Sequence, residues 1–353
     1  MEIEFLKKLL NTPGVSGFET AAGGLFRDYM GPYVDKCNVD VLGNSYALIE
    51  KKQLHNASSV KFMIEAHIDE IGFQVIYISD TGYLYLRRNG GIDVQCVPGS
   101  QVIVCTTSGE EILGIIGKKP MHLINPDERG KKIELENLWV DTGRDPDEVK
   151  NKISIGDAVI PKSNMICLTE NRITSKGLDD KIGVFIVSQV MKRLSVIPDL
   201  SHTIYGVASV QEEVGCRGAI TCGYEINPDI SISVDVDFAT DVPDCSKKEF
   251  GDISLGKGVV ISKNLDNNKD LTYYAENIAK ENDIPYQLSA RFRSSGGTNA
   301  AKIQLSRSGV KTLLLGIPCR YMHTPVELCD LRDVEAAIEL IYKIIINYKC
   351  ILK

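Results

Sequence analysis

The chain has 353 residues, which is too long for one simple core and predicts two domains, or one domain that carries an insertion. Its 43% hydrophobic and 25% charged residues are typical of a globular protein. A net charge of −7 and a pI of about 5.4 argue against nucleic acid or an anionic membrane surface as the main partner.

The N-terminal stretch, residues 1–14, predicts an amphipathic helix that ends near Pro13 and Gly14. It lacks the basic, apolar and small-residue regions of a signal peptide, and no run in the sequence is long enough to span a membrane. We therefore expect a cytoplasmic protein without a membrane partner. The ten cysteines form no CxxC pair, and we expect them to be reduced thiols.

The pattern of elements divides the chain into three segments. Residues 1–70 predict a helix and then strands at 39–50 and 60–70. Residues 71–169 predict a β-rich segment, in which only the stretch from Asp145 to Val149 looks helical. Its expected strands are 72–79, 82–88, 100–107, 109–117 and 156–162.

After residue 170 helices and strands alternate, which favours an α/β domain with a largely parallel sheet. The expected helices are 178–196, 271–283 and 331–348, and the expected strands are 202–210, 229–237 and 310–318. We predict an α/β fold in which residues 1–70 plus 170–353 form a mainly parallel mixed sheet with flanking helices. Residues 71–169 are then an inserted small β-barrel-like domain.

Polar residues that could carry chemistry follow several of these strands. The carboxyl ends of parallel strands form the binding crevice of an α/β sheet, so these residues are expected to converge. They are His67 and Asp69, Glu212 and Glu213, Asp235 (with Asp237 beyond it), and His323 after a short loop. Asp179 and Asp180 open a helix that faces the same crevice.

Each of these residues has an ordinary structural explanation when taken alone. Asp179 or Asp180 could be a helix N-cap, His67 a half-buried histidine, and the two glutamates solvated residues of a first helical turn. Two histidines and several carboxylates at the end of one sheet are harder to explain by packing, and they predict a metal site.

Two histidines and three carboxylates are five ligands of mixed nitrogen and oxygen type, which are too many for one open tetrahedral zinc ion. They suit two ions that share a bridging carboxylate, lower the pKa of a bridging water and polarise a carbonyl group. A sixth residue would be the general base. Neighbouring positions point in different directions, so one of Glu212 and Glu213 can bind metal while the other faces the water.

Several motifs together resemble the glutamyl and deblocking aminopeptidases, the dinuclear metallopeptidases that include the tetrahedral (TET) aminopeptidases. They are "PGVSGFE", "EAHIDEIGF", "VPGSQVIV", "GKKPMH", "LWVDTG", "KGLDDKIGV", "QEEVGCRGA", "SVDVDFATD", "SGGTNAAKI" and "RYMHTPVE". As an ordered set that covers nearly the whole chain, they are specific to this family.

The resemblance implies two divalent metal ions per subunit, with zinc, cobalt or manganese all suitable. It implies that one ion is held by His67, Asp235 and a bridging Asp179, and the other by Glu213, His323 and the same Asp179. Glu212 would be the general base and proton shuttle, and Asp69 would orient the imidazole of His67.

The resemblance further implies a zinc-peptidase-like fold and an aminopeptidase that acts on short peptides. The inserted domain would serve dimerisation, and dimers would assemble into a tetrahedral dodecamer. Two positions depart from the family pattern: Asn299 stands where Asp is common, and Asp237 where an uncharged residue is common. We expect the charge of Asp237 to disfavour peptides that begin with Glu or Asp.

Two other functions compete with this interpretation. Some relatives are described as endoglucanases, and a glycoside hydrolase needs two carboxyl groups but no metal. Glu212 and Asp235 could be such a pair, although His67, His323 and Asp179 would then have no role. The second alternative is a catalytically silent scaffold, which the complete ligand set argues against.

Overall fold

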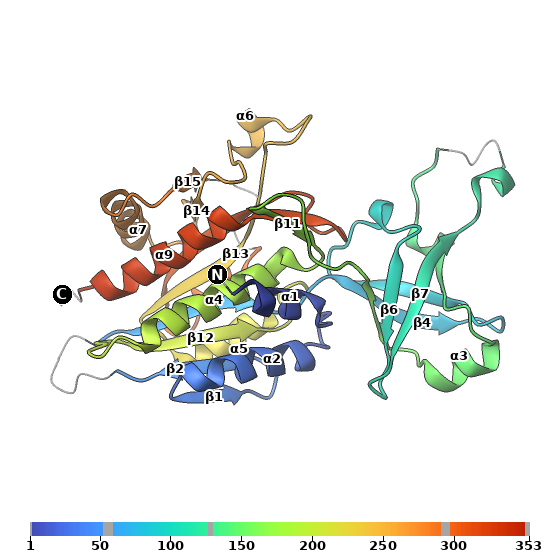
Figure 1. Cartoon of the computed structure of the whole chain (residues 1–353), viewed down its shortest axis with the longest axis horizontal. Coiled ribbons are helices and arrows are strands. Elements are labelled where there is room, and N and C mark those ends of the chain that lie inside the picture. Colours follow the sequence, from blue (N-terminus) through green and yellow to red (C-terminus); the bar gives the residue numbers. More distant parts are fainter. Residues whose placement is uncertain (1, 52–58, 126–129, 291–296, 350–353) are drawn as a thin grey trace.

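The computed structural model describes residues 2–51, 59–125, 130–290 and 297–349. Figure 1 shows a larger lobe, built of a sheet with helices on both of its faces, and a smaller β-rich lobe beside it. The large sheet has eight strands, and the smaller lobe contains a closed barrel. The predicted α/β fold with a mainly parallel mixed sheet and an inserted barrel is thus confirmed.

The large sheet is parallel at its centre and has antiparallel pairs on both sides of this centre, while its last two strands pair parallel. Strands β12, β3, β13 and β16 run parallel, whereas β2 and β14 pair antiparallel with the outer members of this group. The strand order is β1 (Lys36–Val39), β2 (Ser45–Ile49), β12 (Thr203–Ser209), β3 (Lys61–His67), β13 (Ile230–Phe238), β16 (Lys311–Cys319), β14 (Val259–Ser262) and β15 (Tyr286–Ser289). The carboxyl ends of the four central strands therefore lie at one edge.

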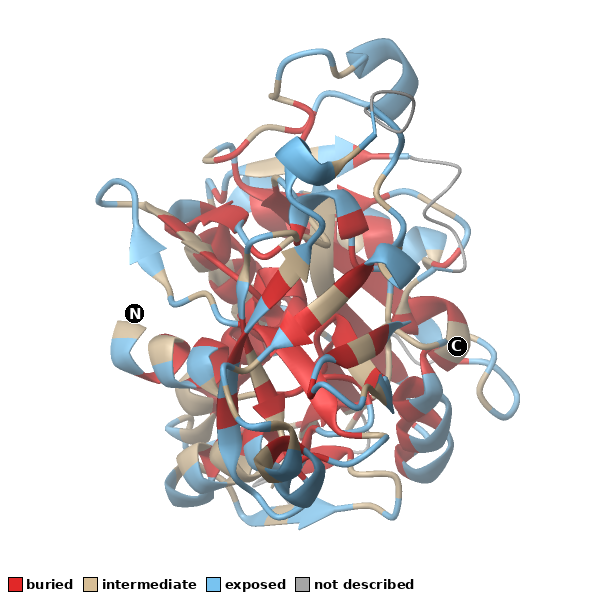
Figure 2. Ribbon diagram, turned by 90° about the vertical axis from the view of Figure 1, so that its right-hand side faces the viewer, coloured by how far each residue is buried: buried red, intermediate tan, exposed pale blue. Residues whose placement is uncertain are grey.

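Helices cover both faces of this sheet. On one face pack α1 (Ile3–Asn11), α2 (Thr20–Met30), α4 (Leu178–Ser195), α7 (Lys269–Glu281) and α9 (Leu331–Asn347). On the other face pack α5 (Arg217–Ile226) and α8 (Asn299–Ile303). Helix α4 is buried along most of its length, because it contacts the sheet on one side and α1 and α9 on the other. Figure 2 shows how buried residues concentrate in this central layer.

The smaller lobe is a closed barrel with a core of its own. Its strands follow the order β4 (Gly72–Ile78), β5 (Leu84–Asn89), β8 (Leu138–Asp141), β7 (Glu111–Lys118), β6 (Gln101–Cys105) and β9 (Ala158–Pro161). Alternate residues of β7 are buried, as the pattern of the sequence predicted. Helix α3 (Pro146–Lys152) begins after Asp145, whose side chain accepts a hydrogen bond from the N–H of Asp147.

A third, small sheet joins two distant parts of the chain. It consists of β10 (Ile166–Cys167), β11 (Arg172–Ser175) and β17 (Glu327–Asp330), all antiparallel. In its register Ser175 lies opposite Glu327. The segment that leads into α4 is therefore held beside the segment that follows His323. A further short helix, α6 (Lys247–Phe250), lies in the connection between β13 and β14.

Strand β13 ends one residue later than the sequence predicted. The expected strand was 229–237, whereas β13 spans Ile230–Phe238 and pairs with β16 as far as Cys319. Its pairing with β3 stops earlier, at Ser233. Asp235 therefore lies inside a strand but beyond its β3 neighbour, and Asp237 shares its face.

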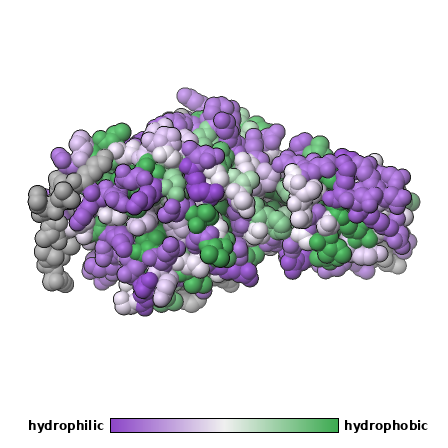
Figure 3. Space-filling view, turned by 90° about the horizontal axis from the view of Figure 1, so that it is seen from below, coloured by the Kyte–Doolittle hydropathy of each residue, from purple (hydrophilic) through white to green (hydrophobic). Residues whose placement is uncertain are grey.

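Within the described ranges, no helix has the length and apolar character that crossing a membrane requires. Figure 3 shows one face of the molecule, on which hydrophilic side chains predominate and apolar ones form separate patches on both lobes.

Candidate metal centre

Six acidic and histidine side chains converge where the parallel strands end. They come from β3, α4, the loop after β12, β13 and the loop after β16, and they are His67, Asp179, Asp180, Glu213, Asp235 and His323. Their positions span more than half of the chain, so only the parallel topology brings them together. Five of the six are the metal ligands expected from the sequence, and Asp180 is the addition.

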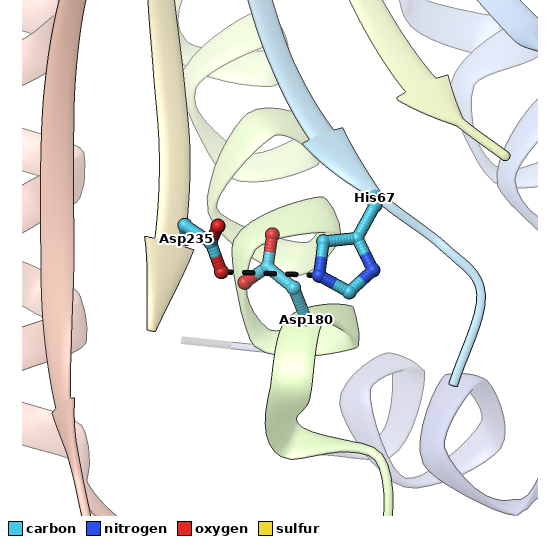
Figure 4. A group of neighbouring side chains, drawn as sticks. All are labelled: His67, Asp180 and Asp235. Carbon is cyan, nitrogen blue, oxygen red and sulfur yellow. Dashed lines mark ion pairs between the residues drawn. The ribbon is translucent and has the colours of Figure 1, made fainter. Parts of the chain in front are cut away.

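One group consists of His67, Asp180 and Asp235, whose ligand atoms all lie within 4.8 Å of one another. Figure 4 shows His67 on β3, Asp235 on β13 and Asp180 at the start of α4, with the three side chains pointing towards one another. Nε2 of His67 lies 3.8 Å from Oδ1 of Asp235. Asp180 also accepts a hydrogen bond from the N–H of Gly183 at 3.1 Å, so it stabilises the first turn of α4 as well.

A second group contains His67, Asp179 and Glu213, again within 4.8 Å of one another. Nε2 of His67 lies 3.1 Å from Oδ1 of Asp179, while Nε2 of His323 lies 3.3 Å from Oδ2 of the same residue. His323 Nε2 is also 3.5 Å from Oε2 of Glu213. The two carboxylate oxygens of Asp179 thus face two different imidazoles.

The charges of this cluster fit divalent cations. Burial raises the pKa of Glu213 and of Asp235 well above their ordinary values, and the charge of Asp179 adds to both shifts. Burial likewise raises the pKa of Asp180, with a further contribution from Asp235. Among the described residues, Oδ2 of Asp180 and Oε1 of Glu213 are buried without a hydrogen-bond partner. Buried carboxylates at this density are stable as charged groups only with cations beside them.

Asp69 organises the backbone around the site. Its carboxylate accepts the hydroxyl of Ser16 at 2.6 Å and the N–H groups of Glu212 and Glu213 at 2.9 and 3.1 Å. Its Oδ1 lies 3.4 Å from Nδ1 of His67, and its backbone carbonyl oxygen lies 3.1 Å from the same nitrogen. One fully buried carboxylate therefore touches both the histidine and the loop that carries the two glutamates.

The two adjacent glutamates lie in different surroundings. Glu213 belongs to the second group, whereas Glu212 is in neither group. Oε1 of Glu212 accepts a hydrogen bond from the thiol of Cys216 at 3.3 Å. Burial raises the pKa of Glu212; His67 opposes this shift, and the charges of Asp179 and Asp69 add to it. A carboxylate with a raised pKa is a better proton acceptor near neutral pH.

Glu327 belongs to the site, although it was not among the candidate residues predicted from the sequence. From β17 its carboxylate accepts the N–H of Asp179 at Oε2 and the N–H of His323 at Oε1, both at 3.0 Å. It therefore holds the backbones of two candidate ligands at once. The only signal in the sequence is its place in the motif "RYMHTPVE".

The departure at Asn299 has a clear structural setting. Its amide Nδ2 donates to Oε2 of Glu65 at 3.0 Å and to the hydroxyl of Ser209 at 2.9 Å. Glu65 is fully buried two residues before His67, and burial raises its pKa to about 7. The uncharged amide of Asn299 can therefore donate a hydrogen bond to Glu65, whereas the carboxylate of an aspartate at this position would repel Glu65.

Comparisons with known proteins identify the family of this chain. The sequence model of the M42 glutamyl aminopeptidase family matches residues 45–340. A lysyl aminopeptidase from Pyrococcus furiosus is 34% identical over 341 residues, which are 96% of this chain and 94% of that protein.

Two solved structures are similar over almost the whole chain. A TET aminopeptidase from the marine sediment archaeon Thaumarchaeota archaeon SCGC AB-539-E09 has a TM-score of 0.91 at 33% identity, and the match covers 98% of this chain and 96% of that one. The TET1 peptidase of Pyrococcus horikoshii, described as able to assemble into a tetrahedron or a large octahedral shell, has a TM-score of 0.85 at 29% identity. That match covers 98% of this chain and 99% of the other.

The matched range of the family includes every residue of the cluster, from His67 to His323. The resemblance inferred from the motifs is thereby confirmed. This chain belongs to the M42 glutamyl aminopeptidase family.

Proposed function

We propose that this M42 aminopeptidase removes N-terminal residues from short peptides by hydrolysis that depends on two divalent metal ions per chain. The observation that carries the proposal is the position of Asp179 between His67 and His323, with one oxygen towards each. A carboxylate in this position is suited to bridge two ions, each with one histidine.

The remaining ligands are assigned from the distances of the two histidines to the other carboxylates. We assign His67 and Asp235 to one ion and His323 and Glu213 to the other, with Asp179 shared. Asp179 is preferred to Asp180 as the bridge because an oxygen of Asp180 already accepts the N–H of Gly183. This set of imidazole and carboxylate donors suits zinc, cobalt or manganese.

Individual residues of the protein would have separate roles in the proposed reaction. When bound, the ions would lower the pKa of a water molecule and polarise the carbonyl group of the scissile peptide bond. Glu212 would accept the proton of that water and deliver it to the departing amine. Asp69 would keep His67 and the backbone of both glutamates in position. Glycoside hydrolysis is not favoured, because it would leave His67, His323 and Asp179 without a role.

A panel of aminoacyl-nitroanilides, assayed after chelation and after repletion with zinc, cobalt or manganese, tests the proposal. We expect chelation to abolish activity and repletion to restore it, with about two ions bound per chain at saturation. Elemental analysis that gives one ion or fewer under metal excess would contradict the dinuclear site. Glucan hydrolysis that resists chelation would support the glycosidase instead.

The same panel tests the influence of Asp237. This residue shares a face of β13 with Asp235, so we expect its negative charge to disfavour acidic first residues. The Pyrococcus furiosus relative is described as a lysyl aminopeptidase, and a basic first residue agrees with the expected preference against acidic ones. Lys and Leu substrates should be cleaved faster than the Glu substrate. The Asp237→Asn variant should show a smaller difference between these cleavage rates. Fastest cleavage of the Glu substrate would contradict this expectation.

Self-association is the remaining part of the proposal. The Pyrococcus horikoshii relative is described as forming a tetrahedron or an octahedral shell, and we propose that this chain also forms dimers and larger assemblies. We propose residues 71–169 as the dimerisation domain and residues 1–70 plus 170–353 as the catalytic domain. Light scattering that detects only monomers at micromolar concentration would contradict the assembly. A cytoplasmic location stays a prediction from the sequence.

A further inference from the structure

A short turn of the barrel reaches into the candidate metal centre. It consists of residues 89–93, which begin at the last residue of β5. The carbonyl oxygen of Gly91 lies 3.2 Å from Nδ1 of His323, and the N–H of Asp93 donates to the carbonyl oxygen of His323 at 3.0 Å. The side chain of Asn89 donates to the carbonyl oxygen of Ser16 at 2.9 Å. This turn therefore contacts both the ring and the backbone of one candidate ligand.

The contact with Gly91 determines which nitrogen of His323 carries the proton. A carbonyl oxygen can only accept a hydrogen bond, so Nδ1 must donate to it. In the neutral ring Nε2 then keeps its lone pair, and Nε2 is the nitrogen that faces Asp179 and Glu213 at 3.3 and 3.5 Å. Histidines that bind metals usually donate their second ring nitrogen in this way, which fixes the tautomer and the ring orientation.

The turn leaves no space for side chains on this side of the ring. A Cβ atom on Gly91 would lie 2.7 Å from Nδ1 and 2.9 Å from Cε1 of His323. A Cβ atom on Gly90 would lie 3.2 Å from Cβ of Glu213, and Gly90 has a φ of +80°. His323 itself has a φ of +64°, a conformation that costs energy in a residue with a side chain. It is held between the barrel turn and Glu327, which accepts its N–H.

We propose that Gly91 is a positioning residue for the metal centre, and that the barrel turn 89–93 is part of the catalytic unit as well as of the inserted domain. Its carbonyl oxygen holds His323 in the tautomer and orientation that present Nε2 to a metal ion. The missing side chain at position 91 lets the backbone come within hydrogen-bonding distance of the ring. This inference rests on the proposed dinuclear function.

Gly91→Ala in the full chain tests it. The methyl group would push the ring away from the carbonyl oxygen, so we expect the affinity for one of two ions to fall by roughly 10–100-fold. Titration with Co²⁺, followed by calorimetry and visible absorption, measures affinity and coordination separately from activity. Gly114→Ala is the matched control: its Cβ would lie 2.6 Å from Cγ1 of Val140, a similar clash inside the barrel. It should lower thermal stability but leave both Co²⁺ affinities unchanged.

A second pair of variants removes the backbone contact. Asp93 has a φ of −76°, which proline adopts readily, so Asp93→Pro deletes the N–H that binds His323 without forcing the turn. Asp93→Ala keeps that N–H and loses the side-chain bonds that Asp93 accepts from the N–H of Gln95 and the thiol of Cys96. We expect the proline variant to weaken one Co²⁺ site and the alanine variant to retain both.

The outcomes separate this inference from the proposed function. Wild-type protein that binds two Co²⁺ ions, together with Gly91→Ala and Asp93→Pro variants that bind both with unchanged affinity, would overturn the role of the turn alone. Wild-type protein that binds no more than one ion would overturn the proposed dinuclear site itself.

Discussion

Glu212→Gln is expected to lower kcat by roughly 10²–10⁴-fold, the usual contribution of general base catalysis. Glutamine keeps the size of the side chain and can still accept a hydrogen bond from Cys216, but it cannot take a proton near neutral pH. Glu212 lies outside both ligand groups, so both metal ions should stay bound and KM should change little. Steady-state kinetics and metal analysis of the same preparation are the measurements.

Glu213→Gln is the matched comparison, since it makes the same chemical change one residue further on. Glu213 belongs to a ligand group and lies 3.5 Å from His323. Its replacement should weaken one metal ion, and excess metal should restore part of the activity. Metal loss in Glu212→Gln with full occupancy in Glu213→Gln would mean that the two roles are exchanged.

Glu70→Ala is expected to cost about 3–5 kcal/mol of stability, because it leaves two buried lysines without their counter-charge. Glu70, Lys176 and Lys181 are all buried, and Nζ of the two lysines lies 2.8 and 2.5 Å from the carboxylate. The lysines also donate to the carbonyl oxygens of Leu10 and Thr12, so this cluster attaches the end of α1 to the start of α4.

Unfolding in urea at a fixed chain concentration measures the loss. Glu50→Ala serves as the control, because it removes the partner of Lys36 from an ion pair in which both side chains are more than half exposed. Pairs of that kind contribute about 0–1 kcal/mol. Equal losses in the two variants would contradict the importance of the buried cluster. Since Lys181 directly follows Asp179 and Asp180 in the chain, the metal affinity of Glu70→Ala should be measured as well.

The sequence predicted the helices α4, α7 and α9 and the central strands, but it did not predict helices α2 and α5, which have 11 and 10 residues. The alternation of helices and strands after residue 170 and the short strands of the barrel are properties of neighbouring residues, so they can be read from a single chain. Strands β14 and β15 have four residues each, and helix α8 has five, which is too short for a periodic pattern to emerge. These elements were not predicted.

The candidate ligands could be selected from the sequence because they follow predicted parallel strands. His67, Glu213, Asp235 and His323 reach one edge of the sheet through this topology alone. These residues also lie within motifs of the family, which occur in the same order along the chain. The sequence therefore predicted the fold class and the family, and it selected five of the six residues of the cluster.

Only the tertiary structure showed that the neighbouring residues Glu212 and Glu213 lie in different surroundings. Glu212 and Glu213 lie in a turn that begins at Gln211, whose φ is +57°, and Asp69 accepts a hydrogen bond from the N–H of each. The structure also added partners that no local pattern connects to the site. Glu327 lies 148 positions from Asp179, and Gly91 lies 232 positions from His323. Such contacts depend on the packing of separate elements, and periodicity along the chain carries no information about them.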